Sequence, residues 1–206
     1  MKYDIITFGS ATLDVFMQSD KLQVLESDKF ATKKGICVPL GSKLHIKDVG
    51  FYMGGCGTNS AVTFGRQGLK TAYFGAIGKD VGGEQVKKVL KNNKVSLDLI
   101  EESNKYPTAF SVVLSVPARN ASPARHVDTS HADWHSDAGG PDVTLPTEAS
   151  AKAGRSILEK YGACHQLIER DIDFDKLDTN WFYISSLSHK NHNIFMTILL
   201  HNIKYI

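Results

Sequence analysis

The sequence predicts an α/β protein whose mostly parallel central sheet is covered by helices on both faces. Short apolar and β-branched segments suit buried strands, and helical segments alternate with them along the chain. Parallel strands are joined by crossovers, usually helices, so this alternation is typical of such a sheet. The chain has 206 residues, of which 42% are hydrophobic, and this is enough to bury a core without disulfides or metals.

The first elements follow this alternation in order. Apolar and β-branched residues at Tyr3–Gly9 predict the first buried strand. A helix is expected at Asn59–Gln67, because small residues begin it and Gly68 is placed to end it in the left-handed conformation. Strand composition returns at Thr71–Ala76.

The alternation continues through a second helix, expected at Glu84–Asn93. Its valines and Leu90 fall on one face and its lysines on the other, which is the pattern of a helix that packs on a core. Two further strands are expected at Ala109–Val116 and Trp181–Ser185.

The segment 118–153 differs in composition from the rest of the chain. It holds eight Ala, three of the six Pro and three of the eight His, but no Ile, Phe or Tyr. Its flanks, Phe110–Val116 and Arg155–Tyr161, would pair as a hairpin through a tight turn if the segment were absent. We therefore expect an inserted flexible loop at a hairpin tip, where added length has a small entropic cost.

Histidines and aspartates crowd one part of this segment. His131 and His135 are four residues apart, so on a helix they could both bind zinc, with a third ligand from Asp128 or His126. The low apolar content is instead typical of a mobile, solvated loop. We favour the loop and assign no metal site.

Charge and cysteine content exclude several classes of protein. The net charge of +2 argues against a nucleic-acid binder with a broad basic face. No apolar run reaches the roughly 18 residues that span a bilayer, and the first residues lack the features of a signal peptide. Cys37, Cys56 and Cys164 suit neither a disulfide framework nor a zinc motif. We expect a cytoplasmic protein with reduced thiols and no membrane partner.

The segment Gly54–Ala61 (Gly-Gly-Cys-Gly-Thr-Asn-Ser-Ala) is the most informative one for function. Its glycines allow a ligand to approach the backbone, and the helix that follows is expected to add unpaired N–H donors. Asn59 could either cap that helix or hydrogen-bond a ligand hydroxyl. No Gly-Lys-Ser/Thr follows, and the first turn, Gly9–Asp14, lacks a dinucleotide fingerprint. An oxygen-rich small ligand is expected.

The spacing of these residues resembles the first signature of the ribokinase-like (PfkB) family of carbohydrate kinases. Gly68 and Gly78 continue the match without a gap. The resemblance extends from residue 3 to about 187 outside 118–153, and further segments support it: Phe8–Ser10 with Asp14, Gly75–Gly83, Thr108–Val112 and Trp181–Leu187. It implies a three-layer sandwich with a mostly parallel sheet and a small β lid, incomplete at the carboxyl terminus.

The resemblance implies a role for each matching residue. Asp14 would accept hydrogen bonds from sugar hydroxyls, because a carboxylate is an acceptor only. Gly54 and Gly55 would bring the backbone to the sugar, and Asn59 would hydrogen-bond a hydroxyl. Asp80 is expected to cap the helix after Gly78 and not to contact substrate.

The resemblance also implies a domain organisation. Residues 1–206 would form the N-terminal part of a ribokinase-like domain, with a lid built from about 12–20, 30–52, 109–116 and 155–161. The lid would close over the sugar and exclude water. In this family lid strands often pair between subunits, so a homodimer is a further expectation.

By resemblance the activity is ATP- and Mg²⁺-dependent phosphorylation of a sugar or nucleoside hydroxyl. The family's second signature, Gly-Ala-Gly-Asp, holds the catalytic base and part of the ATP site, and it does not occur in the sequence. No catalytic residue is therefore assigned, and the chain is not expected to act autonomously. The alternative is an inactive sugar-binding or lid-dimerising remnant. The residues do not select one sugar.

Overall fold

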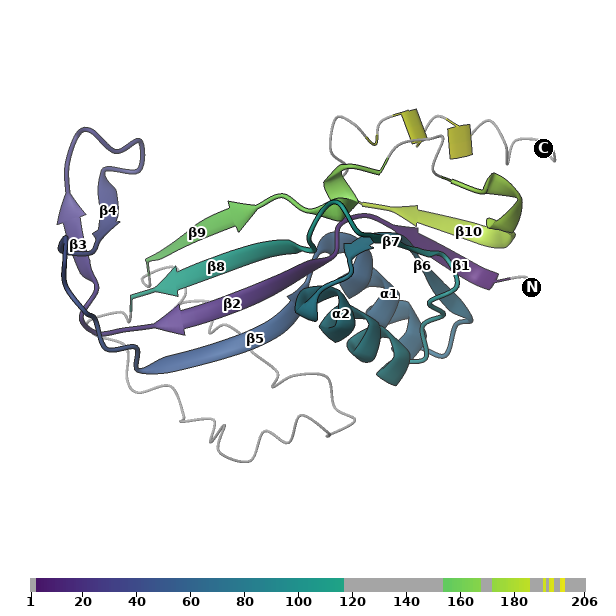
Figure 1. The fold of residues 1–206 in the computed structure, drawn as a ribbon, viewed down its shortest axis with the longest axis horizontal. Helices are drawn as coiled ribbons and strands as arrows, with labels where there is room; N and C mark the ends of the chain where they lie inside the picture. Colours follow the sequence, from purple (N-terminus) through teal and green to yellow (C-terminus); the bar gives the residue numbers. More distant parts are fainter. Residues whose placement is uncertain are drawn as a thin grey trace. The chain divides into compact units, whose positions relative to one another are not determined.

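The computed structural model describes residues 3–116, 154–167 and 172–185, together with 191, 193–194 and 197–198 (Figure 1). The chain divides into two compact units. The first comprises Met1–Leu13, Met53–Phe110 and Glu159–Ile206, and the second comprises Asp14–Tyr52 and Ser111–Leu158.

A four-stranded parallel sheet forms the centre of the first unit. Its strands lie in the order β10-β1-β6-β7, and β1 pairs in parallel with both β6 and β10. Every residue of β6 is buried, as expected for a strand covered on both faces. The strands are β1 (Tyr3–Phe8), β6 (Thr71–Gly78), β7 (Ile100–Ser103) and β10 (Thr179–Ile184).

Two helices pack against an apolar cluster on one face of this sheet. They are α1 (Cys56–Arg66) and α2 (Val81–Asn92). Arg66 Nε donates to Asn93 Oδ1 at 2.7 Å, which links the carboxyl ends of the two helices. The buried residues of this cluster are Ala11, Ala61, Tyr73, Ile77, Val86, Leu90 and Val95.

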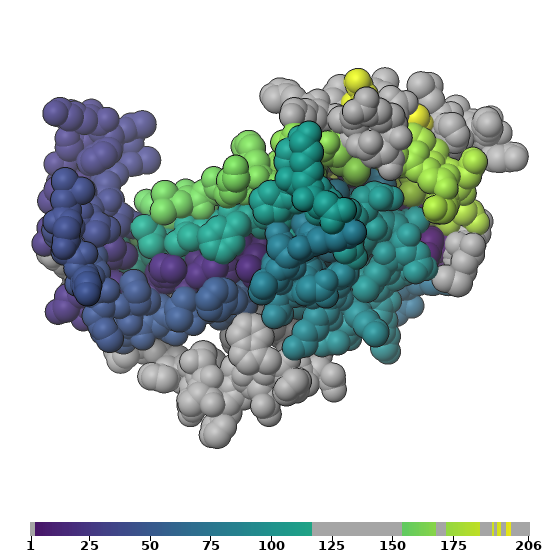
Figure 2. Space-filling view, in the orientation of Figure 1, coloured from purple at the N-terminus to yellow at the C-terminus, as the bar shows by residue number. Residues whose placement is uncertain are grey.

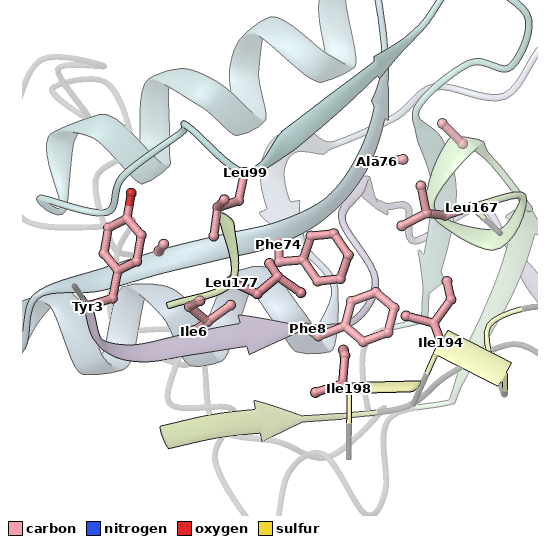
Figure 3. Packing of buried hydrophobic residues seen from close by; sticks show 12 residues of the cluster. Tyr3, Ile6, Phe8, Phe74, Ala76, Leu99, Leu167, Leu177, Ile194 and Ile198 are labelled. Carbon is pink, nitrogen blue, oxygen red and sulfur yellow. The ribbon is translucent and has the colours of Figure 1, made fainter. Parts of the chain in front are cut away.

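A second apolar cluster covers the other face of the sheet. Figure 3 shows the Phe8 and Phe74 rings side by side in it, with ring centroids 4.8 Å apart. Leu167 and Leu177 pack here from the segments around the short 3-10 helices Ala163–His165 and Phe174–Lys176. Ile194 and Ile198 join them from further along the chain. The predicted α/β class, with a mostly parallel sheet covered on both faces, is confirmed.

The second unit holds most of an additional sheet, with strand order β5-β2-β8-β9. In Figure 1 the arrows of β8 and β9 run in opposite directions, and Val116 N–H donates to the Gly154 carbonyl at 3.0 Å. The predicted pairing of these two flanks is therefore confirmed, while segment 118–153 lies outside the described residues. The strands are β2 (Thr12–Gln18), β5 (Asp48–Gly54), β8 (Ala109–Ser115) and β9 (Arg155–Lys160).

A small antiparallel hairpin completes the second unit. It pairs β3 (Gln23–Glu26) with β4 (Lys34–Cys37). Figure 2 shows the side chains of this region in purple and blue. Val24 and Leu25 remain about half exposed on it.

Within the described residues no helix is both long and apolar enough to cross a bilayer.

Both helices begin earlier than the sequence predicts. Helix α1 starts at Cys56 and not at Asn59, and α2 starts at Val81 and not at Glu84. The intervening residues include glycines, which sequence patterns assign to turns. Gly68 ends α1 with φ +87°, as predicted.

Candidate functional site

The glycine-rich turn joins β5 to α1 in the first unit. Gly55 is the residue before the helix, and its φ of +102° lies in the region that side chains avoid. A Cβ at this position would also collide with the Ser10 carbonyl oxygen. Both the backbone conformation and the close approach therefore require glycine at position 55.

Ser10 satisfies the first backbone donors of α1. Its Oγ accepts the Cys56 N–H at 3.1 Å, and its carbonyl oxygen accepts the N–H groups of Gly57 at 3.2 Å and Thr58 at 3.4 Å. The expectation that this helix start offers unpaired donors to a ligand is therefore wrong for these three groups. The donors anchor the turn that follows β1 and are already occupied.

Thr58 fixes the glycine turn from inside the helix. Its buried hydroxyl donates to the Gly54 carbonyl at 2.7 Å and to the Gly55 carbonyl at 3.1 Å. These bonds hold the peptide groups of the turn in one orientation.

Asn59 lies in the first turn of α1 with an exposed side chain. It does not cap the helix, because the residue at the cap position is Gly55 and no side chain there accepts a hydrogen bond. No described residue hydrogen-bonds the Asn59 amide group. The capping alternative is therefore wrong, and an amide with both donors and an acceptor is available to a small molecule.

Asp14 belongs to the second unit, where it lies on β2. Its Oδ1 accepts a hydrogen bond from the Ser111 hydroxyl of β8 at 2.7 Å. Ser111 is buried, whereas Asp14 is half-buried. The carboxylate is thus held at one oxygen and remains partly accessible.

The sequence profile of the pfkB family carbohydrate kinases matches residues 6–132, which is more than half of the chain. This chain belongs to the PfkB family. A search of curated proteins finds no match.

Solved structures share the fold at low identity. Arabidopsis thaliana ribokinase complexed with ribose and ATP is 18% identical, with a TM-score of 0.57 over 89% of this chain and 45% of that one. The Methanocaldococcus jannaschii nucleoside kinase is 15% identical, with a TM-score of 0.54 over 90% and 45%. Giardia lamblia ribokinase is 14% identical, with a TM-score of 0.63 over 97% and 50%. The chain spans about half the length of these three kinases.

The PfkB signature residues are divided between the two units. Gly54, Gly55 and Asn59 come together at the start of α1, whereas Asp14 lies on β2 of the second unit. Their contact with a sugar stays a prediction. Sequence patterns did not indicate Ser10, whose partners lie on a segment more than 40 residues away, because only tertiary contact makes it part of the turn.

Asp80 caps α2, as expected. Its carboxylate accepts from Gly83 N–H at 2.9 Å, from Thr108 N–H at 2.8 Å and from the Thr108 hydroxyl at 2.7 Å. Burial opposes its ionisation, but the hydrogen bonds from Thr108 and Gly83 outweigh this and lower the pKa of Asp80. The residue therefore stabilises the PfkB fold at this turn.

Metal binding finds no support in the described part of the chain. There, no group of three or more His, Cys, Asp or Glu could hold a metal ion. The alternative zinc set, His126, Asp128, His131 and His135, lies outside the described residues.

Proposed function

We propose that this chain supplies the acceptor-binding part of a sugar or nucleoside kinase. Membership of the PfkB family supports a kinase of this class. The observation that carries the proposal is the Gly54–Asn59 turn, which combines the family signature with an exposed amide that no described residue engages. The transferred group would be the γ-phosphoryl of ATP, and the acceptor a hydroxyl of the small molecule.

Two polar side chains provide the proposed recognition of hydroxyls. The Asn59 amide can donate to one hydroxyl oxygen and accept from another hydroxyl group. The Asp14 carboxylate can only accept, and hydrogen bonds to an ionised acceptor are stronger than neutral ones. Gly54 and Gly55 are proposed to let the ligand approach the backbone. A ligand rich in vicinal hydroxyls fits these groups better than an apolar one.

The start of α1 does not offer a phosphate site for ATP. The first donors of α1, which could otherwise bind phosphate oxygens, are taken by Ser10. In the described part of the chain no group of three or more His, Cys, Asp or Glu could hold a metal ion. We therefore assign acceptor binding to these residues and derive no phosphoryl-transfer step from them.

We further propose that the second unit acts as the lid over the bound acceptor. Its described residues are 14–52, 111–116 and 154–158, and the segments expected to form the lid largely fall within it. A closed lid would keep water from competing as the phosphoryl acceptor. Pairing of lid strands between two copies belongs to the same proposal, and the molar mass in solution tests it.

Calorimetric titration of the purified chain with D-ribose and with adenosine tests acceptor binding. Asn59→Ala is expected to weaken binding about tenfold, because one hydrogen-bonding amide is removed. Asn92→Ala is the matched control, since Asn92 is also an exposed helical asparagine. Absence of binding to both probes would contradict the proposal.

The same protein mixed with ATP and Mg²⁺ separates the two forms of the hypothesis. Appearance of a phosphorylated sugar or nucleoside would show that the chain is an autonomous kinase. Acceptor binding without product would favour the inactive sugar-binding alternative.

A further inference from the structure

The carboxylate of Asp14 has a buried partner on the neighbouring strand. Strands β2 and β8 are adjacent in the second unit, and they bring Asp14 and Ser111 together although 97 residues separate them in sequence. The Ser111 hydroxyl lies 2.7 Å from Asp14 Oδ1. This is a typical length for an O–H···O hydrogen bond.

The Ser111 hydroxyl depends on this hydrogen bond because it is buried. Ser111 is only 6% exposed, so its O–H group needs a partner inside the protein. Asp14 Oδ1 is the acceptor it reaches, whereas no described residue hydrogen-bonds Asp14 Oδ2. One oxygen of the carboxylate is thus held by the fold, and the other remains free to accept from a ligand.

We infer that Ser111 is a positioning residue for the acceptor-binding carboxylate of Asp14. This inference rests on the proposed function and adds to it the group that orients the carboxylate. The terminal torsion of an aspartate is broad, so an unpartnered carboxylate samples many orientations. A hydrogen bond from the buried strand β8 selects one orientation before the ligand arrives, which reduces the ordering that binding requires.

Removal of the Ser111 hydroxyl provides the test. Ser111→Ala is expected to raise the dissociation constant for D-ribose or adenosine about 3- to 10-fold, which is the cost of ordering one side chain on binding. Ser111→Cys nearly preserves the volume but donates weakly, so it is expected to behave like Ser111→Ala. Ser111→Thr keeps a hydroxyl and is expected to restore most of the affinity.

A matched control separates orientation from packing. Val113 is buried two residues further along β8, on the same face as Ser111. Val113→Ala removes packing without removing a hydrogen bond, and it should leave the dissociation constant within about twofold of the wild-type value. Deoxyribose analogues add a second readout. For the analogue that lacks the hydroxyl facing Asp14, Ser111→Ala should raise the dissociation constant by a smaller factor.

The hydrogen bond itself is tested without any ligand. Urea unfolding of Ser111→Ala, Asp14→Ala and the double variant should give a non-additive cycle, because each single change removes the same contact. Additive losses would overturn the inference. The inference would also be overturned if the wild-type chain binds the sugar and Ser111→Ala binds it with the same dissociation constant.

Failure of the proposed function is recognised separately. A non-additive cycle would show that the hydrogen bond exists. If the wild-type chain then binds no sugar, the assigned ligand is wrong, and the positioning role is contradicted as well. Sugar binding that weakens in Ser111→Ala and recovers in Ser111→Thr would support both.

Discussion

Replacement of Asp80 is expected to weaken the fold more than any other single carboxylate substitution considered. Asp80 caps α2 through Gly83 and also holds both the backbone and the side chain of Thr108. An N-terminal cap contributes about 1 kcal/mol. The two Thr108 donors add about 1 kcal/mol each, about 2 kcal/mol together, which is below the usual range for bonds to a charged acceptor because the site is only partly buried. Asp80→Ala should therefore lower the free energy of unfolding by about 3 kcal/mol.

Asp80→Asn should have a smaller effect, about 2 kcal/mol, because one amide oxygen still accepts while the NH₂ group faces a donor. Urea unfolding followed by circular dichroism measures both losses. Asp175→Ala is the control, because Asp175 is exposed and has no hydrogen bond or ion pair with a described residue. A loss below about 1 kcal/mol for Asp80→Ala, or one equal to that of the control, would refute the assigned network.

The pH dependence of this contribution has a definite sign. The folded-state pKa of Asp80 is lowered, so its stabilisation is fully present above the unfolded-state value near 3.8. It is lost as the pH falls through the lower, folded-state pKa. The difference between wild type and Asp80→Ala should therefore stay constant from about pH 7 to pH 5 and shrink below about pH 4. A difference that grows on acidification would contradict this sign.

Two further predictions concern close packing and thiol accessibility. Gly65→Ala should destabilise the fold by about 2 kcal/mol despite the better helix propensity of alanine, because its Cβ would collide with the Asn93 carbonyl. Urea unfolding measures this loss, and a stabilised variant would contradict the prediction. Iodoacetamide should modify exposed Cys56 before buried Cys164, because burial raises the pKa of the Cys164 thiol; peptide mass spectrometry measures both rates, and equal rates would contradict the burial.

Local composition was sufficient to predict β1, β6, β10 and both helices of the first unit, but it did not predict β7. The apolar run at Thr71–Ala76 became a strand with every residue buried, and Gly68 took the left-handed conformation expected of a helix end. The cap at Asp80 was also predictable, because an aspartate directly before a helix accepts backbone N–H groups whatever the tertiary context. Features that depend on neighbours in the sequence could therefore be predicted.

Features that depend on contacts between distant segments could not be predicted from the sequence. Ser10 anchors a helix that begins 46 residues later, and no spacing rule connects the two. Ser111 and Asp14 meet only because β2 and β8 are adjacent in the sheet. The helix starts were misjudged because glycine patterns predict turns, whereas Gly57 in α1 and Gly82 and Gly83 in α2 are helical.

The glycine-rich signature has two separable roles in this chain. Gly57 lies against Gly9, where a Cβ would come within 2.8 Å of the backbone, and Gly55 is required by its φ and by Ser10. These glycines are explained by contact between the β1 turn and α1, and no ligand is needed to account for them. Asn59 differs, because its side-chain amide is exposed and hydrogen-bonds no residue in the described part of the chain. Substitutions at Gly55 or Gly57 should therefore act on folding, whereas Asn59 is the position of this motif at which binding can be changed without loss of stability.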